Sequence, residues 1–386
     1  MTEPLELYDV VVTGGGPVGA AAALELHARG ARVLLLEARE PASEASPDGR
    51  PLALSYGSRL ILERLAVWPS LATGASAIQR IHVSQQGRFG RTVLSAADAG
   101  LPALGYVVDY GSVLAALEQR VFASGVSTLR GARVTSVAHD ATTARVNYET
   151  AGAEGACLAP LVAVADGSAE SLGAEVRVID YGQSAITARV STAIAHGHTA
   201  YERFTPEGPL ALLPAGGGFS IVWTTRPARG EWLCAAQPGV FLRELQRTFG
   251  DRAGRFTAVS ARTLHRVSLR VAKHASLGHA VMLGNASQSL HPVAGQGFNL
   301  GLRDAWELAE EVSRRGARDP ALPQAYRARR RIDRGGGIAL THTLVKVFSN
   351  DSALIGVARG AGLTLLDSLP PAKNFFMRRM EFGARG

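Results

Sequence analysis

The sequence predicts an α/β protein in which a Rossmann-like domain carries an inserted antiparallel sheet and is followed by C-terminal helices. A buried strand, Tyr8–Thr13, leads into a glycine-rich turn, an alanine-rich helix and a second strand, Arg32–Glu37. Between residues 184 and 226 the apolar residues alternate with a period of two, which is typical of antiparallel strands. The length of 386 residues exceeds what one hydrophobic core usually serves. We therefore expect two lobes.

The remaining elements follow from the same apolar periods. Before the change of period we expect a strand at 52–54, a helix at Ser58–Leu65, a hairpin at Ile78–Ser84 and Arg91–Ser95, a helix at Gly111–Phe122 and strands at Ala132–His139, Ala144–Glu149 and Leu158–Ala165. The second lobe should contain Ala185–Ile194, Pro209–Leu213, Phe219–Thr225 and a helix at Phe241–Phe249, and the chain should return near Arg262–Val271. Helices are expected at Leu322–Phe348 and Ala353–Leu366.

The first glycine turn carries a Gly-x-Gly-x-x-Gly pattern in its full context of strand, helix and second strand. Gly14 allows the tight turn, Gly16 lets a pyrophosphate approach the backbone, and Gly19 lets helix and strand pack closely. Glu37, at the end of the second strand, would accept hydrogen bonds from a ribose. This arrangement predicts dinucleotide binding and does not separate NAD from FAD.

Two later stretches could belong to the same ligand site. Asp166 and Gly167 follow a buried strand, which fits either a ligand crevice or an ordinary Asp-Gly turn. Gly284–Ala305 follows another apolar run and contains a glycine pair before a helix that we expect to begin near Phe298. A glycine-rich loop at a helix N-terminus makes an anion site for a large flat ligand, or simply packs on a sheet edge.

Composition and charge limit the classes of partner. The net charge of +8 suggests nucleic acid or an anionic membrane, but only 6% of residues are aromatic and no nucleic-acid motif is present. We expect Arg327–Arg334 to form a solvated basic helix face. The stretch Lys373–Met380 mixes basic and bulky apolar residues, which fits a peripheral membrane contact or a packed terminal helix.

The cysteines and the N-terminus bear on location. The two cysteines, Cys157 and Cys234, are far apart and match no metal or redox spacing. The sequence shows no basic-then-apolar leader and no apolar run long enough to span a bilayer. We therefore expect a cytoplasmic protein without a metal, at most peripheral to the inner membrane.

The three motifs, in this order, resemble those of the flavin-dependent aromatic hydroxylases, the p-hydroxybenzoate hydroxylase class. The resemblance covers nearly the whole chain and is closest to the ubiquinone-biosynthesis branch. It is carried by Asp48–Arg50, Val67–Ala72, Tyr201–Thr205, Gly208–Pro214 and above all His291–Gly301. A Rossmann-like FAD-binding domain of the GR2 type with an inserted antiparallel-sheet substrate domain is the fold that this resemblance implies.

The resemblance implies a set of cofactor-binding residues. They are Gly14, Gly16, Pro17, Gly19, Glu37, Arg39, Arg50, Asp166, Gly167, Asn285, Pro292, Gly295, Gln296, Gly297 and Asn299. The first glycine turn and Glu37 would hold the ADP half of FAD, and Asn285 would contact the ribityl chain. Arg50 ends a loop of turn formers that begins at Pro41, and would lie near the flavin and pyrophosphate. Glu170 and Gly173 stand where the class has a serine and an arginine, which weakens the expectation for NAD(P)H handling.

The implied activity is hydroxylation of a polyprenylated phenol in ubiquinone biosynthesis. The resemblance points to C1 of a 2-polyprenyl-6-methoxyphenol, through a C4a-hydroperoxyflavin formed with NAD(P)H and O2. Alternatives are the C5 or C6 position, a soluble aromatic substrate, or a non-catalytic flavoprotein scaffold in a ubiquinone-synthesis complex. No base is identified for the phenol, and His291, Pro292 and Arg50 are the catalytic candidates.

The expected domains follow from the same resemblance. The FAD-binding domain takes residues 1–75, 98–178 and 265–345, the substrate domain takes 76–97 and 179–264, and 346–386 forms a C-terminal helical segment. Four residues of the second lobe share one sheet face by alternation: Leu210, Leu212, Ile221 and Trp223. That face either contacts an apolar substrate or is plain sheet core.

Overall fold

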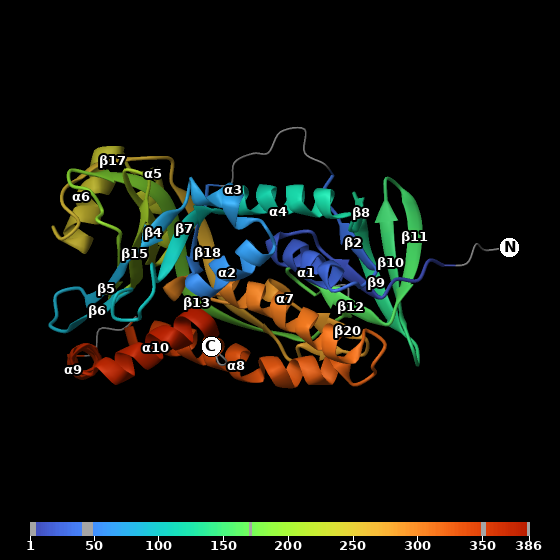
Figure 1. Ribbon diagram of the computed structural model, residues 1–386. Coiled ribbons are helices and arrows are strands. Elements are labelled where there is room, and N and C mark those ends of the chain that lie inside the picture. Colours follow the sequence, from blue (N-terminus) through green and yellow to red (C-terminus); the bar gives the residue numbers. More distant parts are fainter. Residues whose placement is uncertain (1–4, 41–48, 170–171, 349–352, 384–386) are drawn as a thin grey trace.

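The computed structural model of the chain describes residues 5–40, 49–169, 172–348 and 353–383 (Figure 1). Most of the loop expected at Pro41–Arg50 therefore lies outside the described residues, as do Glu170 and Ser171. The helices are α1 (Pro17–Ala28), α2 (Tyr56–Arg64), α3 (Trp68–Ala72), α4 (Tyr110–Ser124), α5 (Pro227–Ala235), α6 (Pro238–Phe249), η2 (Gly284–Ala286), η3 (Val293–Gly295), α7 (Gln296–Arg315), α8 (Leu322–Phe348), α9 (Ala353–Ser368) and α10 (Pro370–Phe382).

The strands in the described residues group into four sheets. They are β1 (Val10–Thr13), β2 (Val33–Glu37), β3 (Pro51–Ser55), β4 (Ser76–Ile78), β5 (Arg80–Gln85), β6 (Arg91–Ser95), β7 (Gly105–Asp109), β8 (Ser127–Arg130), β9 (Arg133–His139), β10 (Ala144–Thr150), β11 (Ala153–Ala159), β12 (Leu161–Val164), β13 (Val176–Thr192), β14 (Thr199–Thr205), β15 (Gly208–Ala215), β16 (Gly218–Thr225), β17 (Phe256–Val259), β18 (Thr263–Ala272), β19 (Ser276–Leu277), β20 (Ala280–Met282) and β21 (Gln288–Ser289).

The first lobe is built on a largely parallel sheet in the order β19-β20-β12-β1-β2-β8. β1 lies at its centre and pairs in parallel with β2 and β12. One core cluster joins this sheet to α1, α4 and α7, and a second joins it to the antiparallel sheet β11-β10-β9 at the end of the molecule (Figure 1). The sheet is covered on both faces, as expected for parallel strands.

The strand expected at Leu158–Ala165 is divided in two at Pro160. The residues before the proline belong to β11, which pairs with β10, and those after it form β12, which pairs with β1. Proline has no backbone N–H and cannot continue a central ladder. The proline therefore marks the point at which the chain leaves one sheet for another.

The second lobe contains a nine-stranded sheet in the order β21-β18-β13-β16-β15-β14-β5-β6, with β17 also paired to β13. The sheet is mixed, because β14 and β5 are parallel. The helices α5 and α6 pack on one face and α9 lies beside the β5–β6 edge (Figure 1). Four residues from four elements, Phe204, Val293, Val345 and Leu363, form a small core between the sheet and the C-terminal helices.

The C-terminal helices connect the two lobes. α8 contacts both α7 and β15, while α10 contacts α2, β3 and α9 (Figure 1). Within the described parts of the chain, no helix is both long enough and apolar enough to cross a bilayer. The stretch Lys373–Met380 lies in α10, and Met377 is buried there while Phe375 is exposed.

Candidate functional site

A groove of about 1180 Å³ crosses the carboxyl edge of the parallel sheet. Its walls come from the β1–α1 turn, the end of β2, the residues after β12 and the segment that joins β20 to α7. Most residues predicted to bind a cofactor line it: Gly14, Gly16, Pro17, Glu37, Arg39, Arg50, Asp166, Gly167, Asn285, Pro292 and Gly297. The carboxyl edge of a parallel sheet is where ligands of open α/β folds bind.

The glycines of the first turn have different surroundings. Gly14 has a φ of +94°, and a Cβ there would lie 2.7 Å from the Ala165 carbonyl oxygen. A Cβ on Gly19 would lie 1.9 Å from the Gly14 oxygen, so this glycine permits close packing of α1 on the sheet. Gly16 has nothing within 4 Å of its Cβ position. It is the N-cap of α1, so the free N–H groups and positive end of the helix dipole lie beside open space for an anion.

Glu37 is a buried carboxylate at the end of β2. It accepts hydrogen bonds from the Gly15 N–H and from the backbone N–H and Nε of Arg39, both at 2.8 Å. Burial acts to raise the pKa of Glu37, but these hydrogen bonds and the Arg39 charge outweigh it and lower the pKa. The group is therefore a fixed, ionised acceptor at the wall of the groove.

The residues after β12 form a tight turn on the opposite wall. Oδ1 of Asp166 accepts the backbone N–H groups of Ser168 (3.0 Å) and Ala169 (2.9 Å). Gly167 has a φ of +87° and nothing within 4 Å of its Cβ position. The turn is an Asx turn that also borders the groove, so its role in binding a ligand stays a prediction.

The segment before α7 forms a third wall of the groove. α7 begins at Gln296, two residues before the expected start, and its N-cap Gly295 is left-handed at φ +59°. Gly297 has nothing within 4 Å of its Cβ position, so the first turn of this helix is open toward the groove. Asn285 is exposed and lines the same groove.

A second cavity, of about 860 Å³, adjoins the groove and shares Pro292, Gly297 and Phe298 with it. Its walls come from β5, β14 and β15 of the nine-stranded sheet and from α8, α9 and α10, and most of them are apolar. His291, Gly295, Gln296 and Asn299 line this cavity and not the groove. The predicted site residues are thus divided between two adjoining spaces.

His291 and Asn299 both use their polar atoms on the protein itself. Nε2 of His291 lies 3.2 Å from Oε1 of Gln183, and Nδ1 accepts the Val293 N–H at 3.1 Å. Burial lowers the pKa of His291 to about 4, so the ring is neutral near pH 7. Asn299 accepts from Ser55 N–H and donates to the carbonyls of Ala53 and Gly295, each at 2.9 Å. Both residues fix the backbone of the 291–299 segment.

The apolar face expected from alternation in the second lobe is core. Leu210, Leu212, Ile221 and Trp223 pack against α5 and α6 in a fully buried cluster. The opposite face of the same strands, with Ala211 and Leu213, lines the second cavity. The alternation with a period of two was correctly identified, and these four residues form the core of the sheet rather than a substrate-contacting face.

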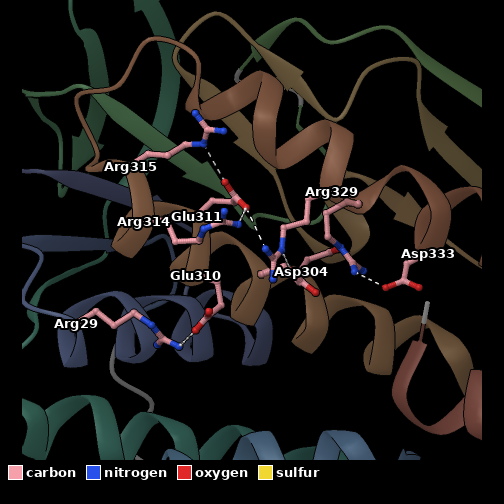
Figure 2. Close-up of polar contacts among 10 residues, drawn as sticks. Arg29, Asp304, Glu310, Glu311, Arg314, Arg315, Arg329 and Asp333 are labelled. Atoms are coloured by element: carbon pink, nitrogen blue, oxygen red, sulfur yellow. Dashed lines mark hydrogen bonds and ion pairs between the residues drawn. The ribbon is translucent and has the colours of Figure 1, made fainter. Parts of the chain in front are cut away.

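The basic stretch Arg327–Arg334 is not a uniformly solvated face, and that expectation is wrong. Arg330 is 2% exposed, and Arg329 pairs with Glu307 of α7. Arg329 also pairs with Glu311 of α7 at 3.1 Å, and both side chains are labelled in Figure 2. Arg329 and Arg330 face inward because α7 presents buried carboxylates at helical spacing, whereas Arg327 and Arg331 are exposed. The ion pairs join α8 to α7.

Asp304 is the centre of this network, and the sequence motifs did not identify it. Its Oδ1 accepts from Nε of Arg330 at 2.7 Å, while its Oδ2 accepts from the Gly284 N–H at 2.9 Å and Nε2 of Gln288 at 3.2 Å. Arg330 also pairs with Asp333 at 2.7 Å. Asp304 therefore fixes the turn at Gly284, which forms part of the groove. The only signal in the sequence was an acidic residue on the apolar side of a helix.

Comparison with known proteins agrees with this geometry. The family model for the FAD binding domain matches residues 7–333. The ubiquinone hydroxylase UbiL of Rhodospirillum rubrum is 34% identical over 97% of this chain and 89% of its own length. The 3-demethoxyubiquinol 3-hydroxylase of Escherichia coli is 31% identical over 78% of each chain.

A solved structure shares the fold. The p-nitrophenol 4-monooxygenase PnpA of Pseudomonas putida DLL-E4 superposes with a TM-score of 0.79 over 99% of this chain and all of its own, at 18% identity. The expected fold class, a Rossmann-like FAD-binding domain with an inserted sheet domain, is confirmed. The chain belongs to the FAD-binding-domain family, in the group that contains the ubiquinone hydroxylases, and is an FAD-dependent monooxygenase.

Proposed function

We propose that this enzyme hydroxylates a polyprenylated phenol in ubiquinone biosynthesis, at C1 of a 2-polyprenyl-6-methoxyphenol, with FAD, NAD(P)H and O2. The observation that carries the proposal is the apolar cavity of about 860 Å³ that shares Pro292, Gly297 and Phe298 with the dinucleotide groove. An apolar pocket with few polar groups is what a prenylated ring requires. The names of the relatives support the same substrate class.

The residues of the groove fit FAD. The open Cβ positions at Gly16 and Gly167 leave room for a pyrophosphate, and Glu37 offers a fixed acceptor for a ribose. Arg50, with its guanidinium 4.7 Å from the centre of the Tyr110 ring, borders the same space. Asn285 would hydrogen-bond the ribityl chain, and Pro292 and Gly297, which line both the groove and the second cavity, would lie against the flavin ring.

When bound, FAD supplies the redox chemistry that activates O2, and the protein supplies the surroundings. The open first turn of α7 presents backbone N–H groups, which stabilise negative charge without a charged side chain. The apolar walls of the second cavity exclude water from the reacting ring. His291 positions the 291–293 backbone through Gln183 and Val293 rather than acting as a base, because burial lowers its pKa to about 4, which makes the ring a weak base, and both nitrogens are engaged in hydrogen bonds.

A second candidate is hydroxylation at C6 or C5 of the ring. It is favoured by the relative whose name assigns it to position 3 of demethoxyubiquinol, at 31% identity. Supplying the FAD-loaded enzyme with NAD(P)H and two prenylphenols, one unsubstituted at C1 and one already hydroxylated there, distinguishes the two positions by the mass and fragmentation of the product. Product from the second substrate alone would contradict the C1 assignment.

The cofactor itself is tested by the colour of the purified protein. The wild-type chain should be yellow, and Gly16→Asp should be colourless, because its carboxylate would fill the space left for a pyrophosphate and repel it. Gly74→Asp, on an exposed turn, is the control and should stay yellow. A wild-type protein that remains colourless when offered FAD would contradict the proposal.

We further propose that α9 and α10 contact the membrane that holds the substrate. Leu365, Leu369 and Phe375 are 59%, 44% and 73% exposed, and Arg378, about one helical turn after Phe375 on α10, is exposed as well. Phe375→Glu should reduce flotation of the enzyme with phosphatidylglycerol vesicles. Phe122→Glu, at a residue 92% exposed on α4, should leave it unchanged. Equal flotation of both variants would exclude this contact.

We retain the expected division of the chain as an interpretation. The hairpin β5–β6 pairs with β14, which supports placing 76–97 with 179–264 in a substrate domain. Residues 1–75, 98–178 and 265–345 would then form the FAD-binding domain, and 346–386 the C-terminal segment. A ubiquinone-synthesis complex remains a proposed partner, testable by co-purification.

A further inference from the structure

The polar groups on the wall of the second cavity are almost all engaged with the protein. His291 and Asn299 are bonded as described above, and Thr92 donates to Asp367 at 3.1 Å. Glu381 accepts the Tyr56 N–H at 2.6 Å. These groups fix the cavity wall and are not available to orient a ligand.

Glu202 differs from these four side chains. It lies in the middle of β14, where alternation places Ala200, Glu202 and Phe204 on the cavity side, and all three line the cavity. Its neighbours across the sheet are Ala211 on β15 and Val83 on β5, which offer no polar side chain. Within the described residues its Oε1 is buried and has no hydrogen-bond partner.

An unpartnered buried carboxyl oxygen is costly to the fold. Leaving a buried polar group unsatisfied costs about 1–3 kcal/mol, and a buried charge costs more. Burial raises the pKa of Glu202 to about 8, so near pH 7 the group is largely a neutral acid that can both donate and accept a hydrogen bond. Such a group in an apolar cavity next to a cofactor groove indicates a ligand contact.

We propose that Glu202 is the specificity-determining residue of the second cavity: its carboxyl hydrogen-bonds the hydroxyl of the phenolic substrate and so sets which ring carbon faces the segment shared with the groove. This inference rests on the proposed function, since it needs a phenol in the cavity. A ring held by its hydroxyl at one point and by its prenyl chain against apolar walls has only one orientation. Glu202 acts by contact with substrate and needs no change in the flavin site.

The test compares a phenol with its methyl ether. A short-chain 2-prenylphenol and its O-methyl ether are titrated into the FAD-loaded full chain, and binding is followed by the change in flavin absorbance. The wild type should bind the phenol more tightly than the ether. In Glu202→Met, whose side chain is apolar and of similar size, the ratio of the two affinities should fall by about tenfold, which is the value of one hydrogen bond. Glu202→Gln can still donate and accept and should keep the preference.

Two further variants keep the test decisive. Phe204→Leu, on the same face of the same strand, should weaken both probes equally, because it changes volume and not polarity. If Glu202→Met fails to hold FAD, Glu202→Ala takes its place. An unchanged preference in the apolar variants, or equal binding of the two probes by the wild type, would overturn the role of Glu202 alone. An FAD-loaded wild type that binds neither probe would overturn the phenol substrate and Glu202 with it.

Discussion

Substitution of Asp304 by asparagine should destabilise the protein by about 3 kcal/mol, at the lower end of the cost of breaking a buried ion pair. The side chains of Asp304 and Arg330 are 3% and 2% exposed and lie 2.7 Å apart. Arg330 would keep Asp333, also at 2.7 Å, and the amide oxygen could still accept one of the former hydrogen bonds. The alanine variant would in addition leave the Gly284 N–H unsatisfied, for about 1–3 kcal/mol more.

These magnitudes decide which variant to use. Domains are typically stable by about 5–15 kcal/mol, so the alanine variant is at risk of not folding and asparagine is the practical choice. Glu310→Gln is the matched control on the same helix. Glu310 pairs with Arg29 of α1 at 2.9 Å, but the two side chains are 34% and 18% exposed (Figure 2). A partly solvated pair contributes only about 0–1 kcal/mol.

Urea unfolding of the FAD-free proteins, followed by tryptophan fluorescence, measures both losses. Because Asp304 also holds the Gly284 turn, its asparagine variant should bind FAD more weakly, while Glu310→Gln should bind it as the wild type does. If the two variants lose the same free energy of unfolding within about 0.5 kcal/mol, the claim that the buried ion pair contributes more than the partly exposed one is refuted. Unchanged FAD affinity in the Asp304 variant would refute the link to the groove.

Burial raises the pKa of Glu381 to about 8 in the folded state, above its pKa in the unfolded chain. Between these two pKa values the folded state binds more protons than the unfolded state, so the free energy of unfolding falls as the pH rises. Glu381→Gln should flatten this dependence, by up to about 1.4 kcal/mol per pH unit, in urea unfolding at pH 5.5 and 8; an unchanged slope would contradict it. Burial raises the pKa of Cys157 to about 12, so a thiol reagent should label only Cys234 in the native state; two rapidly labelled cysteines would show the burial to be wrong. Gly19→Val should fail to fold, since even a Cβ would lie 1.9 Å from the Gly14 oxygen, and a folded, yellow variant in a thermal melt would contradict that packing.

The elements with strong local patterns could be predicted from the sequence. The β1–α1–β2 unit and α7 were expected within two or three residues, because their apolar periods and glycines are local signals. The parallel pairing of β5 with β14 was not expected, because it joins residues about 120 apart and no local pattern encodes it. The break at Pro160 was visible as a proline inside an apolar run, and only the partner strands reveal its meaning.

The site was predicted unevenly for a related physical reason. Glycines that expose the backbone to a ligand can be predicted from the sequence, because they lie in a recognisable strand–turn–helix context. Alternation in the second lobe predicted two faces of the sheet but not which face lines a cavity. One face is covered by α5 and α6 and is core, while the other lines the second cavity together with α8–α10, which are distant in the sequence. Glu202 was inside a recognised motif, Tyr201–Thr205, and the lack of a partner for its Oε1 among the described residues is a property of the assembled sheet.

The segment from His291 to Asn299 connects the groove and the second cavity, so variants in this segment should affect the binding of both ligands. Pro292 and Gly297 border both the groove and the cavity, and the segment is held by His291 through Gln183 and by Asn299 through β3. Loosening either anchor should therefore weaken FAD and phenol binding together. Glu202 lies on the wall that the sheet forms and lines the cavity but not the groove, so changes there should affect the phenol alone. Measuring both affinities in each variant would distinguish residues that build the shared segment from a residue that recognises the ring.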